Sequence, residues 1–163
     1  MTAQATMTVL GLDVSLRSTG WAVLTLDDGE LVDCGVITTS PTGTLAKSLR
    51  QIHRAVKHLG DHGDVGIEEG VAHRSGATTR LLAAAWGAAV LGTGKDPHIV
   101  NISTAKRLAT GKGNATKAEM VAAAVARWDD RCAQHDIADA AWIAEATRLH
   151  LIEEIDNHRK DHE

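Results

Sequence analysis

The sequence predicts an α/β fold with a mixed five-stranded sheet, in which three antiparallel strands are followed by two parallel ones and helices cover both faces. Three observations predict it: short apolar runs joined by tight turns at the start, apolar runs alternating with helical periodicity in the middle, and helical patterns at the end. With 163 residues and 44% apolar content, the chain is long enough for one hydrophobic core.

The first three apolar runs predict the antiparallel strands. Residues 7–14 form a short run that contains Asp13 near its end, and residues 20–26 resume the pattern as a second strand. The sequence Asp-Asp-Gly at 27–29 predicts a hairpin turn, and residues 30–39 alternate enough to be its other strand.

Helices and strands alternate after the break at Pro41 and Gly43. Apolar residues recur at helical spacing over 45–59, which predicts an amphipathic helix. We expect the later elements as a strand at 64–69, an alanine-rich helix at 75–91, a strand at 97–102, and helices at 103–109, 115–128 and from about 136, fraying from 156 onward. One domain over 7–155 is therefore expected, between a disordered tail at 1–6 and a charged tail at 156–163.

Composition indicates the compartment in which the protein works and excludes some kinds of site. Cys34 and Cys132 lie far apart and outside any metal-ligand spacing, so neither a disulfide framework nor a zinc site is indicated. The sequence shows no signal-peptide pattern and no run of eighteen apolar residues, which favours a cytoplasmic protein without a membrane partner. Phe and Tyr are absent, so any stacking on bases would use Trp or His.

The charge distribution is uneven although the net charge is only −4. Residues 70–118 hold seven bases and one acid, whereas residues 129–163 hold ten acids and four bases. A basic middle segment is typical of a surface that binds nucleic-acid phosphates. Solvated faces that happen to segregate by charge are the alternative.

Two acidic residues stand at the ends of expected strands. Asp13 follows the apolar run 9–12, and Glu68 follows the run 65–67. Asp13 also has a simpler explanation, as a turn residue that bonds nearby backbone amides. Glu69 faces the opposite side of a strand from Glu68, so only one of the two can join Asp13, and the strand register decides which.

A second acidic pair opens the last expected helix. Asp136 and Asp139 are three residues apart, which places both on one helix face. Helix capping alone would also explain them. Together with the two strand-end acids, however, they supply the all-oxygen ligands that Mg²⁺ or Mn²⁺ prefers, and two such ions can drive phosphodiester hydrolysis.

Four motifs in order resemble the RuvC-type Holliday junction resolvases, over nearly the whole chain beyond Met7. They are Gly-Leu-Asp-Val-Ser-Leu-Arg-Ser-Thr-Gly at 11–20, Gly-Ile-Glu-Glu at 66–69, Lys106 with Gly-Lys-Gly-Asn-Ala-Thr-Lys at 111–117, and Asp-Ile-Ala-Asp-Ala-Ala at 136–141. The resemblance implies an RNase H-like fold and a homodimer that nicks four-way DNA junctions with two Mg²⁺ or Mn²⁺ ions per site, leaving 5′-phosphate ends. It assigns the catalytic and metal-binding roles to Asp13, Glu68, Asp136 and Asp139.

The resemblance also indicates where DNA binds. It makes Lys106 and Lys117 phosphate or DNA contacts, beside a Gly-Lys-Gly loop that could approach a phosphate backbone closely. The full set of expected DNA-binding residues is His73, Arg74, Lys106, Arg107, Lys112 and Lys117. A solvated turn before a helix is the alternative for the loop. The expected dimer interface is the helix at 75–86, which could equally pack only against the sheet.

Departures from the family pattern point to a phage-encoded or divergent member. Val14 and Ser15 stand where cellular members usually have Pro-Gly, and Val71 stands where they commonly have a stacking aromatic residue. Members of the divergent branch can accept a wider range of branched DNA, including flaps and forks. His135, directly before the acidic pair, could tune that pair or contact substrate, or could be a plain pre-helix residue.

Two other functions are compatible with parts of the sequence. A non-catalytic protein could recognise branched DNA by shape and charge alone. The stretch 13–20 also looks like the first phosphate loop of actin-like ATPases and sugar kinases, but the chain lacks the length and the second loop that those proteins need.

Overall fold

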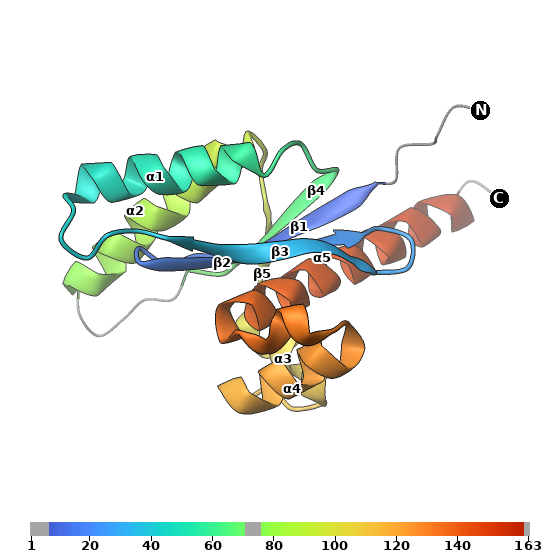
Figure 1. Cartoon of the computed structure of the whole chain (residues 1–163). Coiled ribbons are helices and arrows are strands. Elements are labelled where there is room, and N and C mark those ends of the chain that lie inside the picture. Colours follow the sequence, from blue (N-terminus) through green and yellow to red (C-terminus); the bar gives the residue numbers. More distant parts are fainter. Residues whose placement is uncertain (1–6, 71–75, 162–163) are drawn as a thin grey trace.

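A computed structural model, which describes residues 7–70 and 76–161, has a five-stranded mixed sheet at its centre (Figure 1). The strands are β1 Thr8–Asp13, β2 Ser18–Thr25, β3 Leu31–Thr38, β4 Asp64–Glu68 and β5 His98–Val100. Their order is β3-β2-β1-β4-β5. β1, β2 and β3 pair antiparallel, whereas β4 runs parallel to both β1 and β5. The predicted fold class is confirmed.

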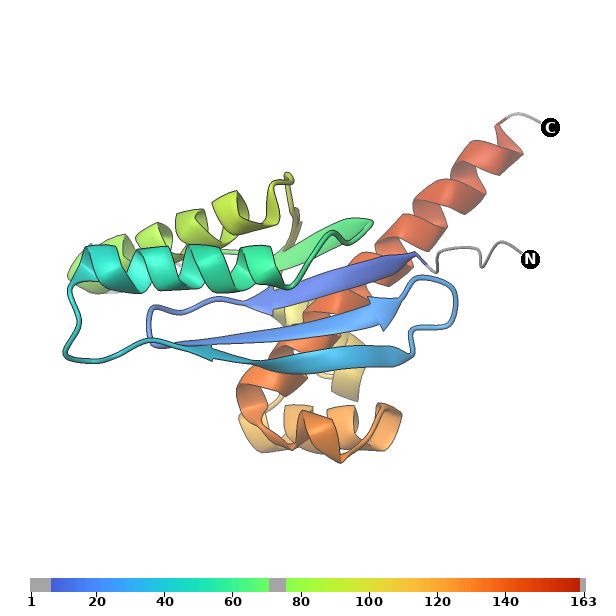
Figure 2. The ribbon, with the colours of Figure 1, turned by 45° about the horizontal axis from the view of Figure 1, so that its top comes forward.

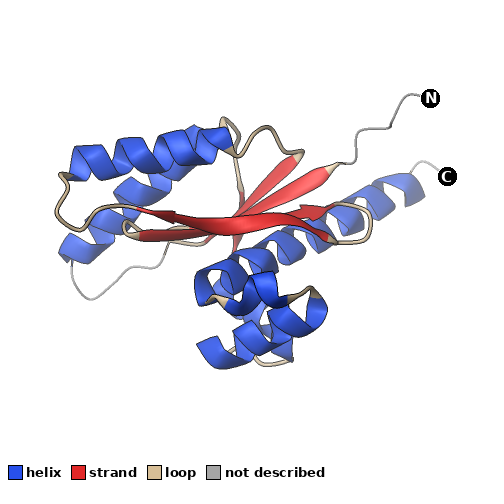
Figure 3. Ribbon diagram, in the orientation of Figure 1, coloured by secondary structure: helices blue, strands red, loops and turns tan. Residues whose placement is uncertain are grey.

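Helices cover both faces of this sheet (Figures 2 and 3). One face carries α1 Leu45–His58 and α2 Gly76–Thr93, and the other carries α3 Ile102–Thr110, α4 Lys117–Arg127 and α5 His135–Lys160. Each face has its own apolar core: Ile52, Val56 and Ile67 belong to the first, and Met120 and Ile143 to the second. None of the helices within the described ranges is both long and apolar enough to span a membrane.

Local signals explain most helix starts. Thr44 caps α1 by accepting a hydrogen bond from the Lys47 amide, and Asn101 caps α3 through the Ser103 amide. Because Asn101 begins the helix cap, β5 is shorter than the expected strand at 97–102. At α4, Thr116 and Glu119 form a reciprocal capping box.

The last helix differs from its expected form at both ends. A short 3₁₀ turn, Asp130–Ala133, precedes it, and the helix then continues to Lys160 instead of fraying at Asp156. Basic residues in its last turn interact favourably with the negative, C-terminal end of the helix dipole, and this interaction stabilises the extension. Residues 1–6 and the last two residues of the expected charged tail lie outside the described part of the chain.

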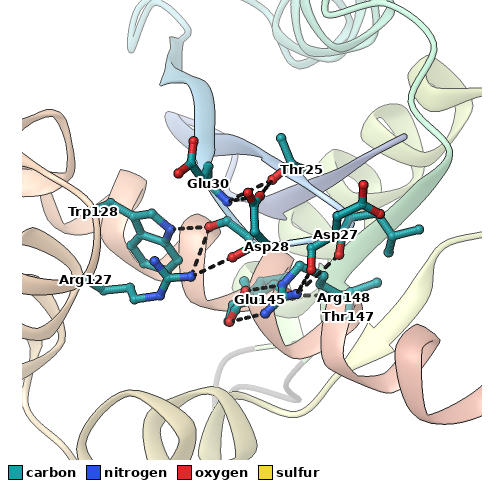
Figure 4. A network of polar contacts seen from close by, with 12 residues as sticks. Thr25, Asp27, Asp28, Glu30, Arg127, Trp128, Glu145, Thr147 and Arg148 are labelled. Atoms are coloured by element: carbon teal, nitrogen blue, oxygen red, sulfur yellow. Dashed lines mark hydrogen bonds and ion pairs between the residues drawn. The ribbon is translucent and has the colours of Figure 1, made fainter. Parts of the chain in front are cut away.

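A buried ion pair within α5 positions an arginine that hydrogen-bonds to the β2–β3 hairpin (Figure 4). Arg148 Nε lies 2.7 Å from Glu145 Oε2, and Arg148 Nη1 donates to the carbonyl oxygens of Leu26 and Asp27. Trp128 Nε1 donates to the Gly29 carbonyl at 2.8 Å from the other side. These bonds satisfy a buried guanidinium and hold β2 against α5, the helix that carries two of the candidate site residues.

Candidate functional site

Asp13 and Glu68 end two neighbouring parallel strands. Leu12 of β1 is paired with Ile67 of β4, so the next residue of each strand lies at the same edge of the sheet. Both side chains are partly buried, and, after the larger effect of burial, the negative charge of Glu68 raises the pKa of Asp13. The structure therefore brings together the two strand-end acids that the sequence singled out.

Glu69 faces away from this pair. Its backbone amide donates to the Val100 carbonyl at 2.8 Å, and its carboxylate accepts a hydrogen bond from Asn101 Nδ2 at 3.0 Å. Glu69 is exposed, unlike Glu68. The pairing of β4 with β5 thus settles the choice that the sequence left open, in favour of Glu68.

Asp136 lies in the first turn of α5 and is held on both of its carboxylate oxygens. Oδ2 accepts a hydrogen bond from Ser18 Oγ at the start of β2, and Oδ1 lies 2.8 Å from His135 Nδ1. Ser18 is itself fixed, because its amide donates to Ser15 Oγ at 3.0 Å. The buried Asp136 is therefore oriented by a serine 118 residues away in the chain.

Glycines on three adjacent strands let α5 lie against the sheet at this point. A Cβ on Gly20 of β2 would overlap the backbone carbonyl of Asp136, and one on Gly11 of β1 would overlap that of Ala140. On β4, a Cβ on Gly66 would meet the Thr147 side chain. Only the missing side chains allow this close approach. It places Asp136 and Asp139 beside the ends of β1 and β4.

Burial and mutual repulsion raise the pKa values of two of the four acids. Burial is the largest cause at Asp13, and negative charges on Glu68, Asp139 and Asp136 raise its pKa further, well above the usual value. At Asp139, burial followed by the charge of Glu68 raises the pKa to about 6. The carboxylates that raise the pKa of Asp13 are those of Glu68, Asp139 and Asp136, so the four acids belong to one cluster.

Two lysines oppose this negative charge. Lys117, at the start of α4, and Lys106, in α3, both lower the pKa of Asp139, as does His135. Lys106 is partly buried, whereas Lys117 is exposed. Cations beside a carboxylate cluster are suited to hold a phosphate that would otherwise be repelled by it.

The other expected DNA-binding residues are placed differently. Lys112 Nζ lies 3.5 Å from Glu119 Oε1, so its charge is partly neutralised. Arg107 lies against Gly113 in the Gly-Lys-Gly loop and is exposed. His73, Arg74 and Val71 lie outside the described residues.

Sequence reasoning missed the supporting role of Ser18 and of Trp86. Trp86 packs against the core under α1 and α2, and its Nε1 also donates to the Glu68 backbone carbonyl at 3.3 Å. The sequence gives little indication of this role for Ser18. In the structure, β2 runs antiparallel to β1 and Gly20 pairs with Asp13, so Ser18, the first residue of β2, lies beside the site. His135 was noted as a neighbour, and the structure places it against Asp136.

The four acids are gathered but do not yet form a coordination shell. Within residues 7–70 and 76–161, no set of three or more Asp, Glu, His or Cys side chains is arranged so that it could hold a metal ion. The two carboxylate oxygens of Asp136 contact Ser18 and His135. As a donor set, four carboxylates nevertheless match the oxygen preference of Mg²⁺ and Mn²⁺.

Comparison with known proteins identifies a matching family and several relatives. The family model described as crossover junction endodeoxyribonuclease RuvC matches residues 9–146. A protein of that name from Granulibacter bethesdensis is 35% identical over 127 residues, which are 71% of this chain and 69% of the relative. Another from Nitrobacter hamburgensis is 31% identical over 151 residues, covering 83% and 85%.

Solved structures share the fold. Thermus thermophilus RuvC in complex with a Holliday junction substrate superposes with a TM-score of 0.73 at 24% identity, covering 85% of this chain and 90% of that one. The fowlpox virus Holliday junction resolvase superposes with a TM-score of 0.56 at 11% identity, covering 89% and 99%. Both support the RNase H-like architecture that the resemblance implied.

Proposed function

The chain belongs to the RuvC family of crossover junction endodeoxyribonucleases, and we propose on that premise that it nicks four-way DNA junctions and also other branched DNA. The observation that carries the proposal is the gathering of Asp13, Glu68, Asp136 and Asp139 at one end of the sheet, where the charges of Lys106 and Lys117 lower the pKa of Asp139. Such a site combines oxygen ligands for hard cations with charges that attract a phosphate. The cytoplasm is the proposed setting.

Each residue has a distinct role in this proposal. Asp13, Glu68, Asp136 and Asp139 would hold Mg²⁺ or Mn²⁺, two ions per site. Bound there, such ions would supply an activated water for in-line attack on phosphorus and stabilisation of the leaving 3′ oxygen, so that the product would carry a 5′-phosphate. Lys106 and Lys117 would hold the scissile strand, with Arg107, Lys112, His73 and Arg74 as further DNA contacts. Ser18 would orient Asp136, which it already bonds.

In metal-free buffer, the acidic cluster is expected to make stability depend on pH. The folded state raises the pKa of Asp139 from 3.8 to about 6. Its contribution to the free energy of unfolding is therefore fully present below about pH 4 and is lost as the pH rises through about 6. This one carboxyl accounts for at most about 3 kcal/mol. In urea titrations with EDTA, Asp139→Asn should be more stable than wild type at pH 7.5 and lose that advantage near pH 4.

Thermal unfolding in EDTA-free buffer, with and without added metal, tests metal binding without relying on activity. Mg²⁺ or Mn²⁺ should raise the wild-type melting temperature at pH 7.5, because a cation bound by the folded state removes the repulsion. Asp139→Asn should respond much less. An equal response in both proteins, or none in wild type, would count against the proposed cage.

We further propose that the enzyme is a homodimer that pairs through α2. The outward face of α2 carries Ala83, Gly87 and Leu91, spaced four residues apart, and Leu91 is 73% exposed. A Cβ at Gly87 would meet nothing within 4 Å, so a second helix has room to approach there. The family resemblance implies the helix at 75–86 as the interface, with packing against the sheet alone as the alternative.

Gly87→Arg is expected to convert the dimer to a monomer while leaving the fold intact. The new side chain points into open space and replaces glycine in a helix, which favours folding by roughly 1 kcal/mol. Light scattering after gel filtration measures the mass. Ala122→Arg, at an exposed position of α4, is the matched control and should stay dimeric. A monomeric wild type, or a dimeric Gly87→Arg variant, would refute the interface.

A cleavage assay tests the function directly. Purified protein is incubated with labelled four-way, flap, fork and linear DNA, with and without Mg²⁺ or Mn²⁺, and the cuts are mapped. We expect metal-dependent nicks in the branched substrates and intact linear duplex. Tight junction binding without cutting in either metal would instead favour a non-catalytic binding protein.

A further inference from the structure

Helix α1 lies on the sheet face opposite α3 and α4 (Figures 1 and 2), and basic residues line a second surface along it. It is a groove of about 450 Å³ along the helix. Its lining residues recur every three to four positions and so form one stripe: Lys47, Arg50, Gln51, Arg54, Ala55 and His58. We call this surface the α1 groove.

The charges of the α1 groove are not neutralised within the protein. Lys47, Arg50 and Arg54 are exposed, and none of them forms an ion pair with the described residues. The surrounding segment, residues 34–60, contains no acid at all. Lys95 and Arg131, by contrast, are paired with acids on the surface. An unneutralised row of cations favours a polyanionic partner.

The α1 groove is anchored to the strands that form the candidate site. Gln51 Nε2 donates to the carbonyl of Thr38, the last residue of edge strand β3, at 2.7 Å. Arg17, in the loop that follows Asp13, reaches across to Ser40 and to Ser48 of α1. The stripe from Lys47 to His58 spans about 16 Å at 1.5 Å per residue, roughly half a turn of duplex DNA.

From this placement we propose that the α1 groove binds the phosphate backbone of a duplex DNA arm, separate from the strand held by Lys106 and Lys117. The proposal rests on the proposed junction-cutting function. Because α1 and α3 cover opposite faces of the sheet, one phosphate cannot contact both basic surfaces. A branched substrate, however, presents several arms, and a second docking surface would fix the angle between the cut arm and its neighbour.

Salt-dependent binding to an uncut junction tests this inference. Arg50→Gln/Arg54→Gln is compared with Arg159→Gln/Lys160→Gln, which removes two exposed charges from the far end of α5. Binding is measured by fluorescence anisotropy with a labelled four-way junction in EDTA. Removing two phosphate contacts should lower the slope of log affinity against log salt by about 1.8 and the affinity by up to about 60-fold at 0.1 M salt.

The α5 variant should bind like wild type, and Arg50→Lys/Arg54→Lys should retain most of the binding because the charges remain. Equal losses of junction affinity in the two glutamine variants would indicate a general charge effect and would overturn the proposal. Unchanged junction binding by the α1 variant would overturn it as well. So would an α1 variant that loses binding to poly-glutamate but not to DNA, since the partner would then be an acidic protein.

Cleavage of the bound junction separates this inference from the function on which it rests. At saturating enzyme and with metal present, the α1 variant should nick at the wild-type rate, because the four acids and two lysines of the site are untouched. A wild type that binds but never cuts would refute the nuclease function, and the salt slopes would still decide whether the α1 groove binds DNA.

Discussion

Replacing Asp13 with asparagine is expected to reduce junction nicking by roughly 1,000-fold or more. The charges of Glu68, Asp139 and Asp136 all act on Asp13, so this carboxyl group interacts with each of the other three proposed ligands. Losing about 4 kcal/mol of transition-state stabilisation from impaired metal binding corresponds to three powers of ten in rate. Single-turnover cleavage of a labelled four-way junction in Mg²⁺ measures the effect.

Folding should survive this substitution. Burial and three neighbouring carboxyl groups hold the pKa of Asp13 well above its usual value, so a neutral amide removes repulsion without changing the shape of the side chain. The melting temperature in EDTA should equal or exceed that of wild type. Glu69→Gln is the matched control, because Glu69 bonds Asn101 away from the site, and it should cut normally. Nicking by Asp13→Asn at the wild-type rate would rule out the assigned site.

Gly20→Ala is expected to lower the free energy of unfolding by about 3 kcal/mol or more and to remove cleavage as well. The added methyl group would overlap the backbone of Asp136, and backbone cannot move aside as a flexible side chain can. Overpacking of this kind usually costs about 1–3 kcal/mol, and more when a whole helix must shift. The displaced start of α5 would carry Asp136 and Asp139 away from Asp13 and Glu68.

Gly43→Ala is the control for that experiment. Its added Cβ would meet only ordinary contacts, the nearest at 3.5 Å, and its backbone needs no positive φ. Urea unfolding and junction cleavage should both stay near wild type. If Gly20→Ala were as stable and as active as Gly43→Ala, the close packing of α5 on β2 would not position the site.

Local patterns in the sequence determined the strands, most helices and the choice of candidate acids. Period-two and helical periodicities depend on which residues are apolar, and caps such as Asn101 and Thr116 act on amides two or three residues away. The hairpin turns and the alternation of strand and helix were therefore predictable. Four motifs in order also led to the correct family.

Tertiary structure decided which of these residues meet. Only the pairing of β4 with β5 turned Glu69 toward Asn101 and left Glu68 beside Asp13. Only the close packing of α5 against strand glycines places Asp136 within hydrogen-bonding distance of Ser18, which is 118 residues away in the sequence. The periodicity of one segment records which of its faces is buried, but not which distant segment buries it. That choice depends on complementary shapes and charges that exist only once the sheet and helices have assembled.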